Sequence, residues 1–148
     1  MTQYEKVALR TLKILKNSND PNKAWDIAAK EIITSVESQK KQCPRNTFLS
    51  LCNMGLIIGV NKGEYTKSKK NKYILNALKI LSDNNNPTPK QLWKEVLDEN
   101  EKGKSHNSEM HVVKVLWDKN YINLEITEKL LRSQQIQEYI IQDNPAIG

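Results

Sequence analysis

Arg45 and Asn46 are adjacent in a polar segment that also contains Lys40 and Lys41. Arginine and asparagine pair bidentately with the edges of guanine and adenine, while lysines hold backbone phosphates. These residue types, with similar ones later in the chain, indicate contact with nucleic acid. The candidate contact residues are Lys40, Lys41, Arg45, Asn46, Lys62, Lys67, Lys69, Lys70, Lys72, His106, Asn107 and Lys114. The alternative interpretation is that these side chains only cap and solvate the starts of helices.

Lysines are concentrated in the middle of the chain, where residues 62–72 contain five of them with hydroxyl side chains between. The net charge of +6 is made up of +4 for residues 1–60, +4 for residues 61–72 and −2 for residues 73–148. A positive first half and connection suit an acidic partner, and such a run could follow a phosphate backbone with salt-dependent affinity. The alternative is a hydrophilic connection whose charge serves only solubility.

Residues that could bind a metal or catalyse a reaction have unsuitable spacing. His106 and His111 are five positions apart, whereas four would place two ligands together on one helix face. Cys43 and Cys52 have no CxxC partner, and a shared Cys/His zinc site would need two different helices to begin side by side. The sequence contains no GxGxxG, P-loop, HExxH or GxSxG motif. We therefore expect no enzyme activity, no catalytic residue, no cofactor and no metal.

An internal repeat organises the elements that must position these residues. At an offset of 66, residues 9–21 and 75–87 are identical at seven of thirteen positions, far more than unrelated sequences share. Trp25 and Trp93 occupy matching places and fall, like Trp117, on apolar stripes, so we expect these rings in the core rather than around a ligand. The repeat predicts two related halves, residues 4–60 and 70–124.

Each half has the sequence pattern of three helices. Apolar residues recur at helical spacing, and the breaks fall at Asn/Pro-rich or polar segments. Gly55 and Asn120 are expected to end the third helix of each half in the left-handed conformation. The residues expected at the starts of the second helices are Asp20 or Pro21 and, in the second half, Thr88 followed by Pro89.

The remaining segments are expected to add a small wing and one more helix. Residues 56–60 and 64–66 predict a short hairpin, and apolar and polar residues alternate over residues 122–126 as in one small strand. Both segments lie where a winged helix has its wing. Residues 127–142 predict a seventh helix that packs across both halves. No apolar run is long enough to cross a bilayer, and the N-terminus lacks the order of a secretion signal, so we expect a cytoplasmic protein without membrane contact.

Three blocks of sequence resemble a known family. They are C-P-R-N-T-F-L-x-L-C-x-x-G-L from Cys43, G-x-Y-T-x-S-x-x-N from Gly63 and H-N-S-x-M-x-V-V-x-x-L-W from His106. Over residues 4–122 the chain is similar to a family of small, uncharacterised bacterial proteins with a domain of unknown function. This resemblance implies a helical architecture and supplies no activity, ligand or catalytic residue. Two of the blocks begin the third helices, where we expect any functional surface to lie.

The predicted fold is all-α. It has two tandem three-helix halves of helix-turn-helix or winged-helix type, a basic connection over residues 61–72 and a C-terminal helix over residues 127–142, all in one compact domain spanning residues 1–148. In a helix-turn-helix protein the third helix enters the DNA major groove. The fold therefore predicts where a nucleic acid would bind, but many tri-helical units use the same packing for other purposes.

The functional hypothesis is a non-enzymatic protein that binds duplex DNA through the third helix of the first half and the lysine run. The alternative is a protein-interaction module, such as an accessory or inhibitory partner in a bacterial or phage system, that binds through an apolar groove between the halves without touching nucleic acid. An enzyme with a Cys43/His106 site ranks behind both. The sequence does not predict an oligomeric state.

Overall fold

The computed structural model describes residues 1–68, 70–83 and 86–143, with side chains to residue 135, and over these residues the chain is all-helical without a strand. The predicted all-α class is confirmed. The elements in chain order are α1 (Gln3–Leu15), α2 (Pro21–Ile32), α3 (Val36–Gln39), α4 (Gln42–Asn53), α5 (Asn71–Ser82), α6 (Pro89–Val96), the 3₁₀ turn η1 (Glu99–Glu101), α7 (Glu109–Asp118) and α8 (Leu124–Asp143).

The second helix of each half begins at the residues that the sequence predicted. Asp20 caps α2 by accepting a hydrogen bond from Lys23 N at 3.1 Å. Thr88 and Gln91 form a reciprocal capping box at the start of α6, and both helices have proline in the first position. These contacts satisfy backbone N–H groups that a helix start leaves without intrahelical partners.

The third helices also end as predicted. Gly55 has φ 73° two positions after the end of α4, and Asn120 has φ 64° two positions after the end of α7. Glycine reaches this left-handed conformation without steric cost, and asparagine tolerates it better than most residues. The repeat has therefore kept the same helix ending with two different residues.

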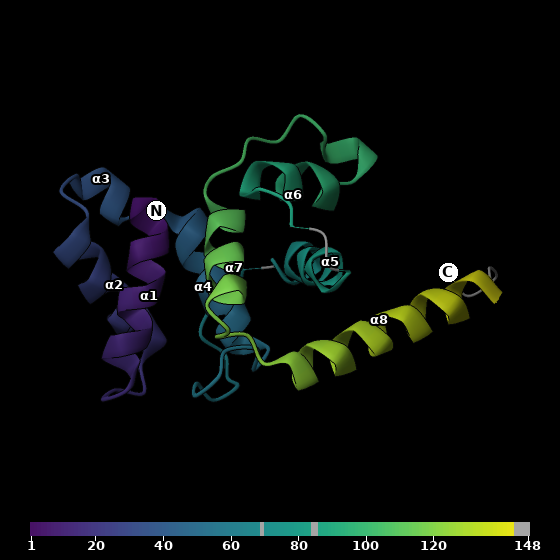
Figure 1. The fold of residues 1–148 in the computed structure, drawn as a ribbon, viewed down its shortest axis with the longest axis horizontal. Helices are drawn as coiled ribbons and strands as arrows, with labels where there is room; N and C mark the ends of the chain where they lie inside the picture. Colours follow the sequence, from purple (N-terminus) through teal and green to yellow (C-terminus); the bar gives the residue numbers. More distant parts are fainter. Residues whose placement is uncertain (69, 84–85, 144–148) are drawn as a thin grey trace.

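The third helices, α4 and α7, pack against each other at the centre of the molecule (Figure 1). α4 also contacts α2 and α5, while α7 also contacts α1, α5 and α6. Every side chain from Thr47 to Cys52 is buried, so α4 has almost no open face along its middle. Because α7 of the second half packs on α1 of the first, both halves share one hydrophobic core.

The segments that follow α4 and α7 pair with each other instead of forming a wing in each half. Ile57 and Ile122 form an isolated antiparallel bridge. Beside it, Ile58 N donates to Tyr121 O at 3.0 Å and Asn123 N donates to Leu56 O at 2.8 Å. The predicted hairpin of residues 56–60 with 64–66 is therefore wrong, because the equivalent segment of the other half satisfies the backbone groups of residues 56–58.

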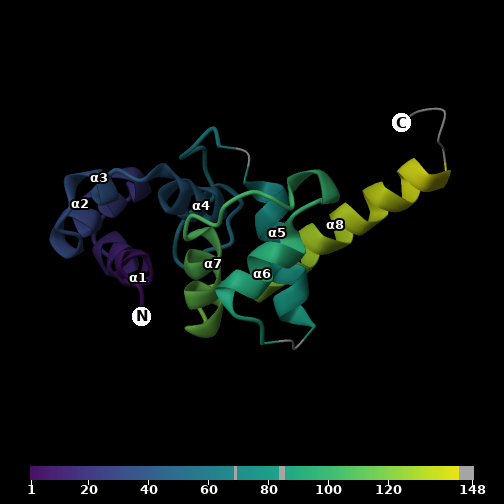
Figure 2. The same ribbon diagram turned by 90° about the horizontal axis from the view of Figure 1, so that it is seen from above.

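The C-terminal helix α8 starts at Leu124, earlier than predicted, because Asn123 Oδ1 accepts a hydrogen bond from Ile126 N at 3.1 Å. Over its described part α8 packs mainly on α5 and then extends away from the body (Figure 2). The expectation that this helix packs across both halves is thus wrong beyond its first turn. None of the helices described is long and apolar enough to cross a membrane.

Candidate nucleic-acid interface

A polar cleft of about 490 Å³ opens where α2, α3 and the start of α4 meet. The short helix α3, which the sequence pattern did not predict, forms because Ser35 caps it by accepting a hydrogen bond from Ser38 N at 3.4 Å. It carries the chain across the end of α2 and sets the position of the cleft. The lining residues are Asp26, Lys30, Gln39, Lys40, Gln42 and Arg45.

Arg45 is fixed in this cleft by residues of α2. Its Nε donates to Asp26 Oδ1 at 3.0 Å, and its Nη2 donates to Asn22 Oδ1 at 3.0 Å. The Arg45 side chain is only 17% exposed. Its Nη1 group has no hydrogen bond among the described residues, so one edge of the guanidinium remains for an anion. Arg45 therefore cannot extend toward a base edge without breaking both contacts.

The first part of the lysine run lies along α4. Asn53 Nδ2 donates to Thr66 O at 2.8 Å, and Thr66 Oγ1 donates to Asn46 Oδ1 at 3.3 Å. Asn22 joins this segment to Arg45, because its Nδ2 donates to Tyr65 O at 3.0 Å while its Oδ1 accepts from Arg45. The structure therefore brings the start of α4 and residues 64–68 to one side of the molecule. Lys69 lies outside the described residues.

Only the start of α4 is open to solvent. A recognition helix presents an open face to the major groove. In the first part of α4 Gln42 is exposed and Arg45 and Asn46 are half-buried, while Pro44 and residues 47–52 are buried. Asn46, proposed as a contact to adenine, is half-buried and accepts the hydrogen bond from Thr66. From Thr47 to Cys52 the helix carries apolar or small residues on all sides, as a helix buried in a core does. The candidate interface is therefore the rim of α4 rather than its length.

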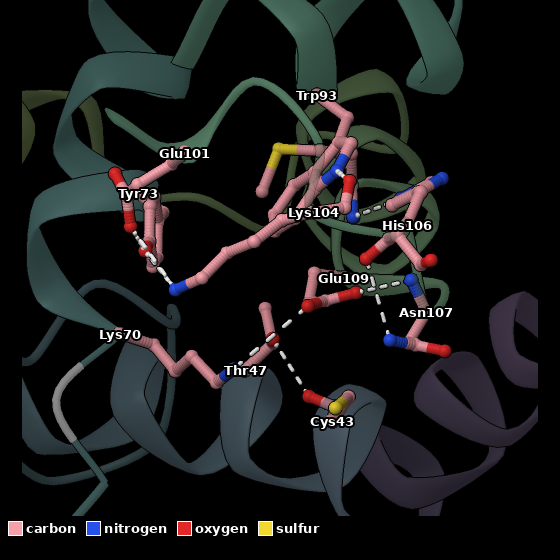
Figure 3. Close-up of polar contacts among 12 residues, drawn as sticks. Cys43, Thr47, Lys70, Tyr73, Trp93, Glu101, Lys104, His106, Asn107 and Glu109 are labelled. Carbon is pink, nitrogen blue, oxygen red and sulfur yellow. Dashed lines mark hydrogen bonds and ion pairs between the residues drawn. The ribbon is translucent and has the colours of Figure 1, made fainter. Parts of the chain in front are cut away.

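The start of α7 contains a buried carboxylate instead of an open binding surface. Glu109 is 3% exposed, and its Oε1 accepts a hydrogen bond from Asn107 N at 2.6 Å. Lys70 Nζ lies 3.8 Å from Glu109 Oε2 (Figure 3). Lys70 and Asn107 were both candidate contacts to nucleic acid, and the structure places them in this internal cluster. Glu109 was missed as a partner because only the packing of α7 against α4 buries it.

His106 lies next to this cluster, stacked between two other rings. Its centroid is 5.3 Å from that of Trp93 and 5.2 Å from that of His111. His106 Nε2 accepts a hydrogen bond from Met110 N at 3.0 Å, which caps α7 and requires this nitrogen to be unprotonated. Burial lowers the pKa of His106 further. His106 is therefore a neutral structural residue at neutral pH rather than a phosphate contact.

Other candidate lysines are paired with acidic residues of the second half. Lys72 Nζ donates to Asp98 Oδ2, and Lys114 Nζ donates to Asp118 Oδ2 at 2.7 Å. The Lys114 side chain is only 13% exposed. Lys114 would have to leave this half-buried pair to bind a phosphate, whereas the Lys72 side chain is 58% exposed and its surface pair can be exchanged.

Four candidate lysines remain exposed without an ion pair in the part of the chain that the structure describes. They are Lys40, Lys41, Lys62 and Lys67. Lys62 lies beside Gly55, near the far end of α4. Lys30, which the sequence analysis missed because it is on α2, lines the cleft together with Lys40. We call Lys30, Lys40, Lys41, Arg45 and Lys67 the basic face.

Two observations concern metal ligands and the buried thiol. Within the described ranges no three His, Cys, Asp or Glu side chains come together as a metal site would need. Burial raises the pKa of Cys52 to about 12, which keeps this thiol protonated and unreactive. Between the halves, α4 and α7 pack against each other.

One comparison with known proteins found a match. The model of a family of unknown function, DUF6979, matches residues 1–123. Searches of the curated proteins and of the solved structures found no match. The match covers both halves of the repeat and ends immediately before α8. It agrees with the resemblance seen in the three sequence blocks and adds no activity to it.

Proposed function

The chain belongs to the DUF6979 family of unknown function, and we propose that it is a non-enzymatic protein that binds nucleic acid through the phosphate backbone. The observation that supports this most directly is the convergence of Lys30, Lys40 and Arg45 on one open cleft beside α4. Lys41 adjoins Lys40 in the chain, and Lys67 adjoins Thr66, whose hydroxyl is bonded to Asn46 next to Arg45. The acidic residue in the cleft, Asp26, is already paired with Arg45.

The proposed contact is to phosphates rather than to base edges. Exposed lysines neutralise phosphates with little orientation, and the remaining edge of a fixed guanidinium can bind a phosphate oxygen. Base reading would need an accessible helix face, and α4 is buried along its middle. We therefore expect binding that depends weakly on sequence and strongly on salt.

A titration of a fluorescent 20-base-pair duplex at two salt concentrations tests the proposal. If Lys30, Lys40, Lys41 and Lys67 each neutralise one phosphate, the affinity falls about 150-fold between 50 mM and 200 mM salt, since the logarithmic slope is roughly −0.9 per phosphate contact. No binding at 50 mM salt would end the proposal.

A matched pair of variants locates the contact. Lys40→Ala/Lys41→Ala removes two charges from the basic face, and Lys90→Ala/Lys94→Ala removes two from exposed positions of α6. We expect the first variant to reduce the salt slope by about two, because each lost phosphate contact lowers it by about one. The second should leave the slope unchanged. Equal effects of both variants would mean that total charge, not the basic face, determines binding.

A further inference from the structure

An apolar groove of about 650 Å³ runs beside α8, at the end of the molecule away from α2 and α3 (Figure 1). Trp117 of α7 and Leu124 and Leu131 of α8 contribute its apolar surface, while Glu125, Glu128 and Arg132 lie along it. Leu124 is 63% exposed although it is a large apolar residue. An apolar surface of this kind, bordered by charges, is typical of an interaction site.

α8 is attached to the body along one side and presents the groove residues on another. Over its described part it packs mainly on α5, through a face that includes Leu130. The groove-lining residues Leu124, Glu128, Leu131 and Gln135 follow one another at steps of four, three and four positions. This spacing is that of the seam along which two helices pack as a coiled coil, with leucine at every second seam position and Glu128 and Gln135 at the others.

The charges next to this seam are self-complementary. Glu125 and Arg132 occupy equivalent flanking positions, one heptad apart, with opposite charge. In an antiparallel helix pair such positions face each other across the seam, so Glu125 of one copy would meet Arg132 of the other at both ends of the contact. A surface that is complementary to itself selects a second copy of the same chain as its partner.

The present ion pairs of these residues do not oppose such an exchange. Glu125 Oε1 lies 3.9 Å from Lys129 Nζ, and Glu128 Oε1 lies 3.6 Å from Arg132 Nη2. All four side chains are between 72% and 80% exposed. Ion pairs of this kind contribute little to stability because water screens them, so they can be replaced by pairs between two copies.

We propose that two copies of the chain associate through α8, packed antiparallel with Leu124 and Leu131 of each copy covered in the groove of the other. The symmetry axis passes near residue 129, which places Glu125 opposite Arg132 of the second copy. The basic face lies at the other end of the molecule (Figure 1) and stays open in this dimer. The proposal does not depend on nucleic-acid binding, and each can fail without the other.

A charge-swap experiment on the full chain tests the proposal. We expect sedimentation equilibrium between 2 and 200 µM to show a monomer–dimer equilibrium for the unchanged chain. Glu125→Arg and Arg132→Glu should each weaken the dimer about tenfold or more, because each places like charges opposite one another twice. The double variant Glu125→Arg/Arg132→Glu should recover most of the affinity, because it restores opposite charges across the seam.

Controls separate association from helix stability. Ser133→Glu adds a charge on the exposed side of α8 opposite the seam and should leave the dimer unchanged. Circular dichroism of each variant reports whether α8 stays helical, and Leu124→Ser tests the apolar seam without changing charge. A monomer at 200 µM overturns the proposal. So does a double variant that dimerises no better than the single ones, or a Ser133→Glu variant that loses the dimer.

Discussion

Lys70 and Glu109 provide a measurable test of how the two halves are joined. Lys70 lies at the end of the basic connection, and Glu109 is buried at the start of α7 with its Oε2 at 3.8 Å from the ammonium. At an effective dielectric constant of about 20 this separation gives an attraction of about 4 kcal/mol, most of which offsets the cost of removing the carboxylate from water. Removal of the lysine alone would leave a buried charge with a single backbone donor.

Lys70→Met should therefore lower the free energy of unfolding by about 1–3 kcal/mol. This value is below the range for fully buried pairs, because the Lys70 side chain is 22% exposed. Glu109→Gln keeps an oxygen that can accept the hydrogen bond from Asn107 N, and it should cost about 1 kcal/mol. The double variant should also cost about 1 kcal/mol, because no unpaired charge remains, so the two changes are strongly non-additive.

Urea denaturation of the four chains at pH 7 measures this coupling. If Lys70→Met costs less than about 0.5 kcal/mol, or if the two effects simply add, the lysine is not the counter-charge of Glu109. The same variant gives an independent control on function. The salt dependence of its affinity for duplex DNA should equal that of the unchanged chain, because an ammonium that is paired with Glu109 contributes no phosphate contact.

Further predictions concern pH, the left-handed residues and a helix cap. Burial lowers the pKa of His106 from its ordinary value of 6.5, so the unfolded chain binds a proton more readily than the folded chain. The contribution of His106 to stability should therefore be complete above pH 6.5 and be lost as the pH falls through the folded-state pKa. The urea midpoint should show this loss in the unchanged chain and not in His106→Gln. Gly55→Ala should cost about 1 kcal/mol in thermal unfolding, because φ is 73°, whereas Asn120→Gly should be neutral or stabilising. Thr88→Ala should cost about 1 kcal/mol in the same assay.

Features that depend on neighbouring residues were predictable from the sequence. Asp20, Thr88 and Pro89 act within a single turn of helix, so residue type alone identifies the starts of α2 and α6. Gly55 and Asn120 likewise mark the ends of α4 and α7 through their tolerance of positive φ. The sequence therefore indicated the helices of each half, while α3, held by a single Ser35 cap, gave too short a pattern to recognise.

Features that depend on long-range packing could not be predicted in this way. Arg45 has the same side chain whether it points to solvent or to α2, and only the fold places Asp26 and Asn22 around it. The hairpin prediction failed for the same reason, since Ile57 found Ile122 as a partner 65 residues away rather than a nearby segment. A repeat makes this harder, because each half offers the other an equivalent alternative partner.

The two halves differ most at the place where the repeat suggested a common function. At the start of α4, Arg45 lies at an open cleft with exposed lysines around it. At the start of α7, Glu109 is buried and His106 is held neutral by Met110 N–H. Since α7 packs on both α1 and α4, a second basic face could form there only by breaking the shared core. Each chain should therefore have one phosphate-binding face. A monomer should contact duplex DNA through one such face, and a dimer joined through α8 should have two.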